Sequence, residues 1–67
     1  MKLTADTITD EQIREVWQVH PNGITGRTLM VALGEPYPSG EYPSVDEIRT
    51  ARARCAEILN ARAEDSP

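Results

Sequence analysis

The feature that most constrains this chain is an apolar segment, residues 23–34, that carries a glycine at each end. Thr25 can cap the start of a helix, because its side-chain oxygen can accept a hydrogen bond from a free backbone amide of the first turn. Gly34 suits the left-handed conformation that ends many helices, and Pro36 prevents the helix from continuing. The segment therefore predicts a short helix over residues 25–34.

A strand over residues 24–33 is the alternative. Three β-branched residues and Gly26 lower the helix propensity of this segment. Its large apolar residues Leu29, Met30 and Leu33 do not alternate along the chain, however. Clustering of this kind favours a helix over a half-buried strand.

Two further helices are expected to begin at complete capping boxes. Thr9 with Gln12, and Ser44 with Glu47, have the spacing at which a hydroxyl and a side-chain acceptor cap each other's backbone amides. Apolar residues follow each box at helical spacing. The sequence therefore predicts an all-α domain of three helices, at about residues 9–20, 25–34 and 44–63.

A chain of 67 residues has room for one small core. We expect a single domain over residues 1–67, with a flexible arm at 1–7 and a frayed tail at 64–67. There is no Phe, so Trp17 is the only bulky ring that can occupy the centre of the core. In the last helix, Val45 is expected to begin the apolar stripe. The opposite side is expected to be solvated and carries Asp46, Arg49, Arg52, Ala53, Arg54, Glu57 and Asn60.

The formal charge of −4 bears on the class of partner. Most of the excess of acidic residues follows residue 34, and duplex nucleic acid repels an acidic surface unless positive charge collects on one face. No apolar run approaches the roughly 18 residues of a membrane helix, and residues 1–10 lack the apolar run of a signal peptide. We expect a cytoplasmic protein with no membrane association.

The sequence offers no recognisable catalytic or metal-binding arrangement. Its one histidine, His20, stands before Pro21, where it can interact with the end of the first helix, and residues 21–23 have the chemistry of a turn. The single Cys55 excludes an intrachain disulfide and fits a small buried apolar residue. Neither a nucleophile elbow nor a phosphate-binding glycine loop is present. We expect a protein that is not an enzyme and that binds no metal and no cofactor.

Residues 35–43 contain three prolines and two tyrosines, which makes extended rather than regular structure the expectation. Two interpretations of Tyr37 and Tyr42 are open. They can fold back as a lid over a core that is short of aromatic residues. They can also form an exposed contact surface, since tyrosine and proline bind with little loss of conformational entropy.

Residues 23–34 also resemble the turn and recognition helix of helix-turn-helix proteins, through the order glycine, aliphatic, threonine, two residues, threonine, aliphatic and a later leucine. This resemblance implies a DNA-binding transcriptional regulator, with Arg27 as the residue suited to a guanine edge. Pro21 and the acidic charge depart from the pattern, which makes nucleic acid the less favoured partner. The residues that would approach the groove are Thr25, Arg27, Thr28 and Val31.

Residues 8–14 and 51–63 resemble small reading frames of phages and prophages of proteobacteria. The resemblance implies an accessory protein that works by stoichiometric binding to a host protein, as inhibitors of CRISPR complexes and other defence systems do. Our leading hypothesis is a small acidic protein that binds and modulates or inhibits a host protein, such as a defence or nucleic-acid-handling protein, in the host cytoplasm. The residues expected to bind this partner are Glu35, Tyr37, Glu41, Tyr42, Asp46 and Glu47.

A third hypothesis is a structural protein that associates with itself through the long last helix. A second copy would add buried surface to a chain too short to bury much of its own. A homodimer is therefore compatible with each of the three hypotheses.

Overall fold

A computed structural model describes residues 2–19 and 24–65, which form three helices, α1 (Asp10–Val19), α2 (Gly26–Leu33) and α3 (Val45–Asp65). The described part of the chain contains no strand, so the all-α prediction is confirmed and the strand alternative over residues 24–33 is wrong. The helix α3 runs on to Asp65, into the tail that the sequence predicts to be frayed. The predictions for His20 and for the turn at residues 21–23 lie outside the described residues.

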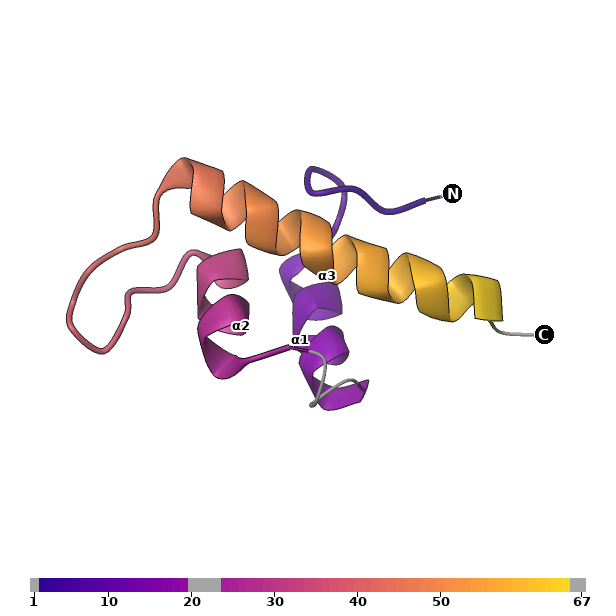
Figure 1. Cartoon of the computed structure of the whole chain (residues 1–67), viewed down its shortest axis with the longest axis horizontal. Helices are drawn as coiled ribbons and strands as arrows, with labels where there is room; N and C mark the ends of the chain where they lie inside the picture. The colour runs from indigo at the N-terminus through magenta and orange to yellow at the C-terminus, as the bar shows by residue number, and fades with distance from the viewer. Residues whose placement is uncertain (1, 20–23, 66–67) are drawn as a thin grey trace.

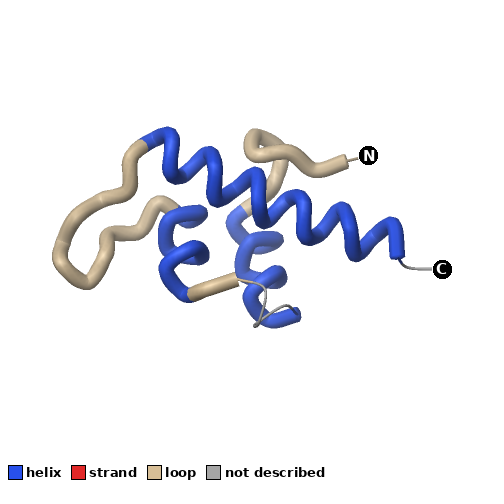
Figure 2. Tube along the Cα trace, viewed as in Figure 1, coloured by secondary structure: helices blue, strands red, loops and turns tan. Residues whose placement is uncertain are grey.

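The two short helices α1 and α2 lie side by side, and both pack against α3, which crosses them (Figure 1). The tube in Figure 2 shows the loop before α3 projecting at one end of the molecule and the C-terminal turns of α3 extending past α1 at the other. The Cα positions span 43 × 23 × 15 Å, so the molecule is a thin slab. None of the described helices combines the length and the apolar character needed to cross a membrane.

Both predicted capping boxes are confirmed. The amide of Thr9 donates to Gln12 Oε1 at 2.9 Å, and the amide of Gln12 donates to Thr9 Oγ1 at 3.2 Å. At the start of α3, the amide of Glu47 donates to Ser44 Oγ at 3.2 Å, and the amide of Ser44 donates back to Glu47 Oε1 at 3.4 Å. These bonds satisfy amides that a helix start otherwise leaves without a partner.

The two ends of α2 also follow the sequence signals. The amide of Thr28 donates to Thr25 Oγ1 at 3.1 Å. Gly34 has φ of +73°, its amide donates to the Val31 carbonyl, and the amide of Glu35 donates to the Met30 carbonyl. This pair of bonds is the Schellman arrangement, in which a left-handed residue closes the last helical turn. The glycine is required there for its backbone conformation.

The core is built largely from short side chains. Four of its members are alanines or cysteine, so the helices approach one another closely. Partly buried residues extend it, among them Leu3, Tyr37 and Leu59. The buried residues of this core are Ile8, Ile13, Val16, Ile24, Val31, Ala32, Ala51, Cys55 and Ala56.

Two predicted core positions are wrong. Trp17 remains 38% exposed, and Val45 is 81% exposed. α1 buries Ile13 and Val16, and Trp17 follows Val16 directly, so it stands about 100° further round the helix, at the edge of the buried side. Val45 is the first residue of α3 and borders a shallow groove with residues 5–6 of the segment before α1, so its side chain stays outside the core.

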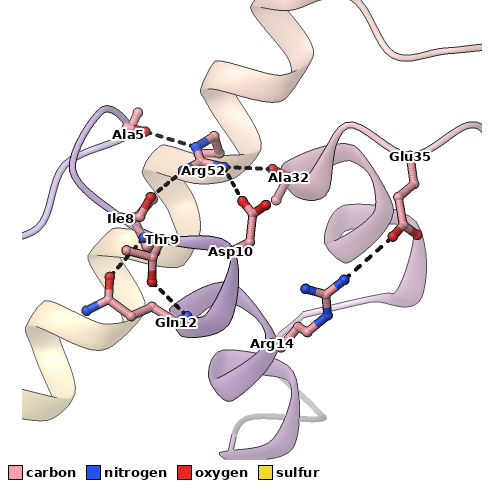
Figure 3. Close-up of polar contacts among 9 residues, drawn as sticks. All are labelled: Ala5, Ile8, Thr9, Asp10, Gln12, Arg14, Ala32, Glu35 and Arg52. Atoms are coloured by element: carbon pink, nitrogen blue, oxygen red, sulfur yellow. Dashed lines mark hydrogen bonds and ion pairs between the residues drawn. The ribbon is translucent and has the colours of Figure 1, made fainter.

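The predicted solvated face of α3 is wrong at Arg52. Its guanidinium bonds to residues of three other segments, and its side chain is only 22% exposed. Nε donates to the Ala5 carbonyl at 3.0 Å, one terminal nitrogen donates to Asp10 Oδ1 at 3.0 Å and to the Ala32 carbonyl at 3.3 Å, and the other donates to the Ile8 carbonyl (Figure 3). One side chain thus joins α3 to both other helices and to the chain before them.

Asn60 is the second residue of that face that turns inward. Its side-chain oxygen accepts from the amide of Leu3 at 2.9 Å, and its side-chain nitrogen donates to the Leu3 carbonyl at 2.8 Å. The sequence predicts a flexible arm over residues 1–7, whereas Leu3 is hydrogen-bonded to Asn60 of α3 and Ala5 to Arg52. The segment before α1 is therefore part of the packed structure.

Replacing Arg52 by Met should destabilise the fold by about 2–4 kcal/mol, because three partly buried carbonyls lose a charged donor while the aliphatic stem is kept. Arg49→Met is the matched control, since Arg49 makes only an exposed ion pair with Asp6 at 3.3 Å and should cost less than about 1 kcal/mol. Urea denaturation followed by circular dichroism measures both. Equal losses for the two variants would contradict the central role of Arg52.

Gly34→Ala should destabilise the fold by about 1 kcal/mol, because alanine does not readily adopt φ of +73°. Steric clash is not the cause, since an added Cβ would meet Ile48 Cδ1 at an ordinary 3.7 Å. Gly26→Ala is the comparison, because that residue is in α2 and a Cβ there meets nothing within 4 Å. Thermal unfolding should show a lower midpoint for Gly34→Ala and an unchanged or higher one for Gly26→Ala.

Candidate functional site

The loop between α2 and α3 is closed by a hydrogen-bonded turn. The amide of Gly40 donates to the Tyr37 carbonyl at 2.8 Å, and the amide of Tyr37 donates to the Glu41 carbonyl at 2.7 Å. Gly40 has φ of +86°, and Pro38 occupies the second position of the turn. This pattern is that of a type I turn followed by a left-handed glycine. The loop is therefore ordered by its own backbone, where the sequence predicts extended segments.

Tyr37 folds back against the core, as the first of the two interpretations expects. Its hydroxyl donates to Glu47 Oε2 at 2.8 Å, and the guanidinium carbon of Arg27 lies 4.8 Å from the centre of its ring. Accepting this bond lowers the pKa of Glu47, with a further contribution from the backbone amide of Ser44. The same bond raises the pKa of Tyr37. The three side chains form one cluster that joins α2, the loop and α3.

Tyr42, in contrast, does not fold back against the core and is 73% exposed. It lies between exposed Glu41 and buried Pro43, and Val45 follows at 81% exposed. Within the described residues, Glu41 forms no ion pair within 4.0 Å, whereas Glu35 pairs with Arg14 at 3.7 Å. We call the exposed group Glu41, Tyr42 and Val45 the α3 entry surface. Val45 is missing from the predicted site because its spacing also fits the apolar stripe.

Asp46 and Glu47, the other two predicted partner-binding residues, border a groove between α2 and α3. The polar side chains of its rim include Arg27 and Arg54, and Val31 and Ala51 contribute apolar surface. The sequence does not reveal this groove, because it is formed by two helices that meet only in the folded chain. The α2–α3 groove is lined by Arg27, Thr28, Val31, Asp46, Glu47, Thr50, Ala51 and Arg54.

Most residues of the helix-turn-helix alternative bond or pack against other residues of the folded chain. Thr25 and Thr28 bond each other through their hydroxyls at 2.9 Å. Val31 is only 7% exposed, so the prediction that it approaches a DNA groove is wrong. It belongs to the core because it lies on the side of α2 that meets α3. Arg27 remains exposed, above the Tyr37 ring.

Chemically reactive groups are sparse. Cys55 is fully buried, as the sequence predicts, and burial raises the pKa of its thiol. A protonated thiol inside the core is a poor nucleophile and a poor metal ligand. Across residues 2–19 and 24–65, no three side chains of the types His, Cys, Asp and Glu gather closely enough to hold a metal ion.

Comparison with protein-family models, with curated proteins and with solved structures gave no match for this chain.

The Tyr37–Glu47 bond predicts a shifted phenol titration. In a Tyr42→Phe background Tyr37 is the only tyrosine, and adding Glu47→Gln should lower the pKa of Tyr37, measured by the ultraviolet absorbance of the phenolate. Glu57→Gln is the matched control and should leave the titration unchanged. A Tyr37 titration that is identical with and without the Glu47 carboxylate would show that the bond does not form in solution.

The same bond makes the free energy of unfolding depend on pH in the acid range. The folded protein lowers the pKa of Glu47, so this contribution to stability is present above the ordinary carboxyl pKa and is lost as the pH falls through the folded value. The free energy of unfolding of the native chain should therefore exceed that of Glu47→Gln at neutral pH, with the difference disappearing in acid.

Proposed function

We propose that this chain is a small accessory protein of the phage type that binds and modulates or inhibits a host protein through the α3 entry surface. The observation that carries the proposal is the exposure of Tyr42 and Val45, at 73% and 81%, on either side of the buried Pro43. Exposed aromatic residues on a rigid support are the usual anchors of protein interfaces.

The support of this surface is rigid on both sides. The turn at Tyr37–Gly40 fixes the loop before it, and the Ser44–Glu47 capping box fixes the first turn of α3 after it. Tyr42 and Val45 therefore lose little conformational freedom when a partner covers them. An anchor that is ordered before binding contributes more of its contact energy to affinity.

The charge of the surroundings indicates the chemistry of the partner. The chain carries a net charge of −4, and Glu41 beside Tyr42 has no ion-pair partner in the part of the chain that the structure describes. A partner with an apolar pocket rimmed by lysine or arginine fits this combination, and the long-range field speeds its association. Host proteins that handle nucleic acid carry such basic surfaces, which accords with the phage-type resemblance of residues 8–14 and 51–63.

The test is affinity capture from host lysate with three forms of the chain. The native chain and Trp17→Ala should retain the same host protein, whereas Tyr42→Ala with Val45→Ala should not, because the anchors of the interface are gone. Trp17 is the matched control, as it is a partly exposed aromatic outside the α3 entry surface. With the purified partner, the double variant should raise the Kd about 30-fold or more.

Added salt should weaken the complex of the native chain, since the attraction between exposed charges is screened. Equal retention by the double variant, with its helical content intact, would exclude the α3 entry surface as the interface. Binding of promoter DNA that weakens steeply with salt would favour the helix-turn-helix alternative instead.

A further inference from the structure

The exposed side of α3 carries a ridge with a groove on each flank. Asp46, Thr50 and Arg54 are exposed and stand four residues apart, so they lie in one row along the helix. We call them the 46–50–54 ridge. All three border the α2–α3 groove, which has a volume of about 400 Å³.

The second groove separates the ridge from the segment before α1. Thr50 and Arg54 border it too, and its volume is about 550 Å³. Its lining is Ala5, Arg49, Thr50, Ala53, Arg54 and Glu57. A row of side chains between two grooves is the shape that packs against another helix, because the ridge of each helix enters a groove of the other.

From this geometry we infer that the ridge is the contact between two copies of this chain, with the two α3 helices antiparallel and a two-fold axis at Thr50. Such an axis places each residue opposite the one equally far from Thr50 on the other side. Arg54 of one copy then faces Asp46 of the second, about 6 Å along the helix from the axis. The same operation repeats the pair on the other side.

The charges of the ridge favour this partner over a chain of a different kind. Arg54 belongs to none of the ion pairs among residues 2–19 and 24–65, and neither does Asp46. Their order along α3 is self-complementary only when the second helix is antiparallel. Glu47, three residues before Thr50, adds negative charge on the Asp46 side of the axis. Thr50 on the axis and Ala53, which the axis places opposite Glu47 of the second copy, are small enough for the helix backbones to approach closely.

The shape of the molecule adds a reason for association. Its Cα positions are only 15 Å deep along the shortest axis, which is the depth of two packed layers of helices, since neighbouring helix axes lie about 8–10 Å apart and the Cα cylinder of a helix has a radius of about 2.3 Å. A slab this thin leaves one side of α3 uncovered along much of its length. A second copy would cover this side, and the surface buried in that contact would add to the stability of a small domain whose core is built from short side chains.

The test is charge exchange across the two-fold axis. Asp46→Arg alone and Arg54→Glu alone each place like charges opposite each other, and each should weaken dimerisation about tenfold or more. An equimolar mixture of the two variants should form a heterodimer, because the arginine introduced at position 46 then faces the glutamate introduced at position 54. The second pair of that heterodimer keeps its native residues, Arg54 opposite Asp46. Sedimentation equilibrium and native mass spectrometry of the whole chain measure these species.

The control is Glu11→Arg, which changes the net charge as Asp46→Arg does but lies exposed on α1. It should dimerise like the native chain, and so should Tyr42→Ala, which separates this contact from the α3 entry surface. Circular dichroism checks that every variant stays helical. A native chain that is monomeric at its highest soluble concentration overturns the inference. Single variants that dimerise normally, or a mixture that forms no heterodimer, overturn it as well.

Discussion

The fold depends on one guanidinium. A short α2, a short α1 and an N-terminal segment without regular structure would each be marginal alone, since isolated helices of this length do not persist in water. Arg52 donates to the carbonyls of Ala5 and Ile8 before α1, to the carboxylate of Asp10 at its start and to the carbonyl of Ala32 at the end of α2 (Figure 3). A planar group with five donors can make this junction, and a lysine cannot.

The short side chains of the core determine how thin the molecule is. Alanines of α2 and α3 and the buried Cys55 let the helices approach closely, which leaves Trp17 at the edge and the whole molecule thin. A thin molecule has a large surface for its length, and two parts of that surface carry exposed features that the fold does not use. One is the α3 entry surface, and the other is the 46–50–54 ridge.

The two tyrosines of the loop have similar neighbours in the sequence but different environments in the fold, since Tyr37 packs inward and Tyr42 is exposed. Tyr37 follows the end of α2 closely enough for its ring to reach Arg27 and for its hydroxyl to reach Glu47. Tyr42 comes after the turn, and buried Pro43 holds the chain beside it. The bond that draws Tyr37 inward therefore also fixes the backbone that presents Tyr42. Neither outcome can be read from the two Tyr-Pro pairs, which are alike in sequence.

The sequence by itself determined the three helices and their ends, because capping is local: Thr9, Thr25 and Ser44 each bond an amide three residues away, and Gly34 closes α2 by its own backbone conformation. It also determined the burial of Cys55 and a set of candidate partner-binding residues around the loop. Only the tertiary structure decided the side of α3 on which Arg52 and Asn60 lie. A periodic pattern counts both as polar and exposed, whereas their partners are 20–57 residues away in the chain. The positions of Trp17, Val45 and the grooves were decided in the same way, since each depends on which helix lies opposite.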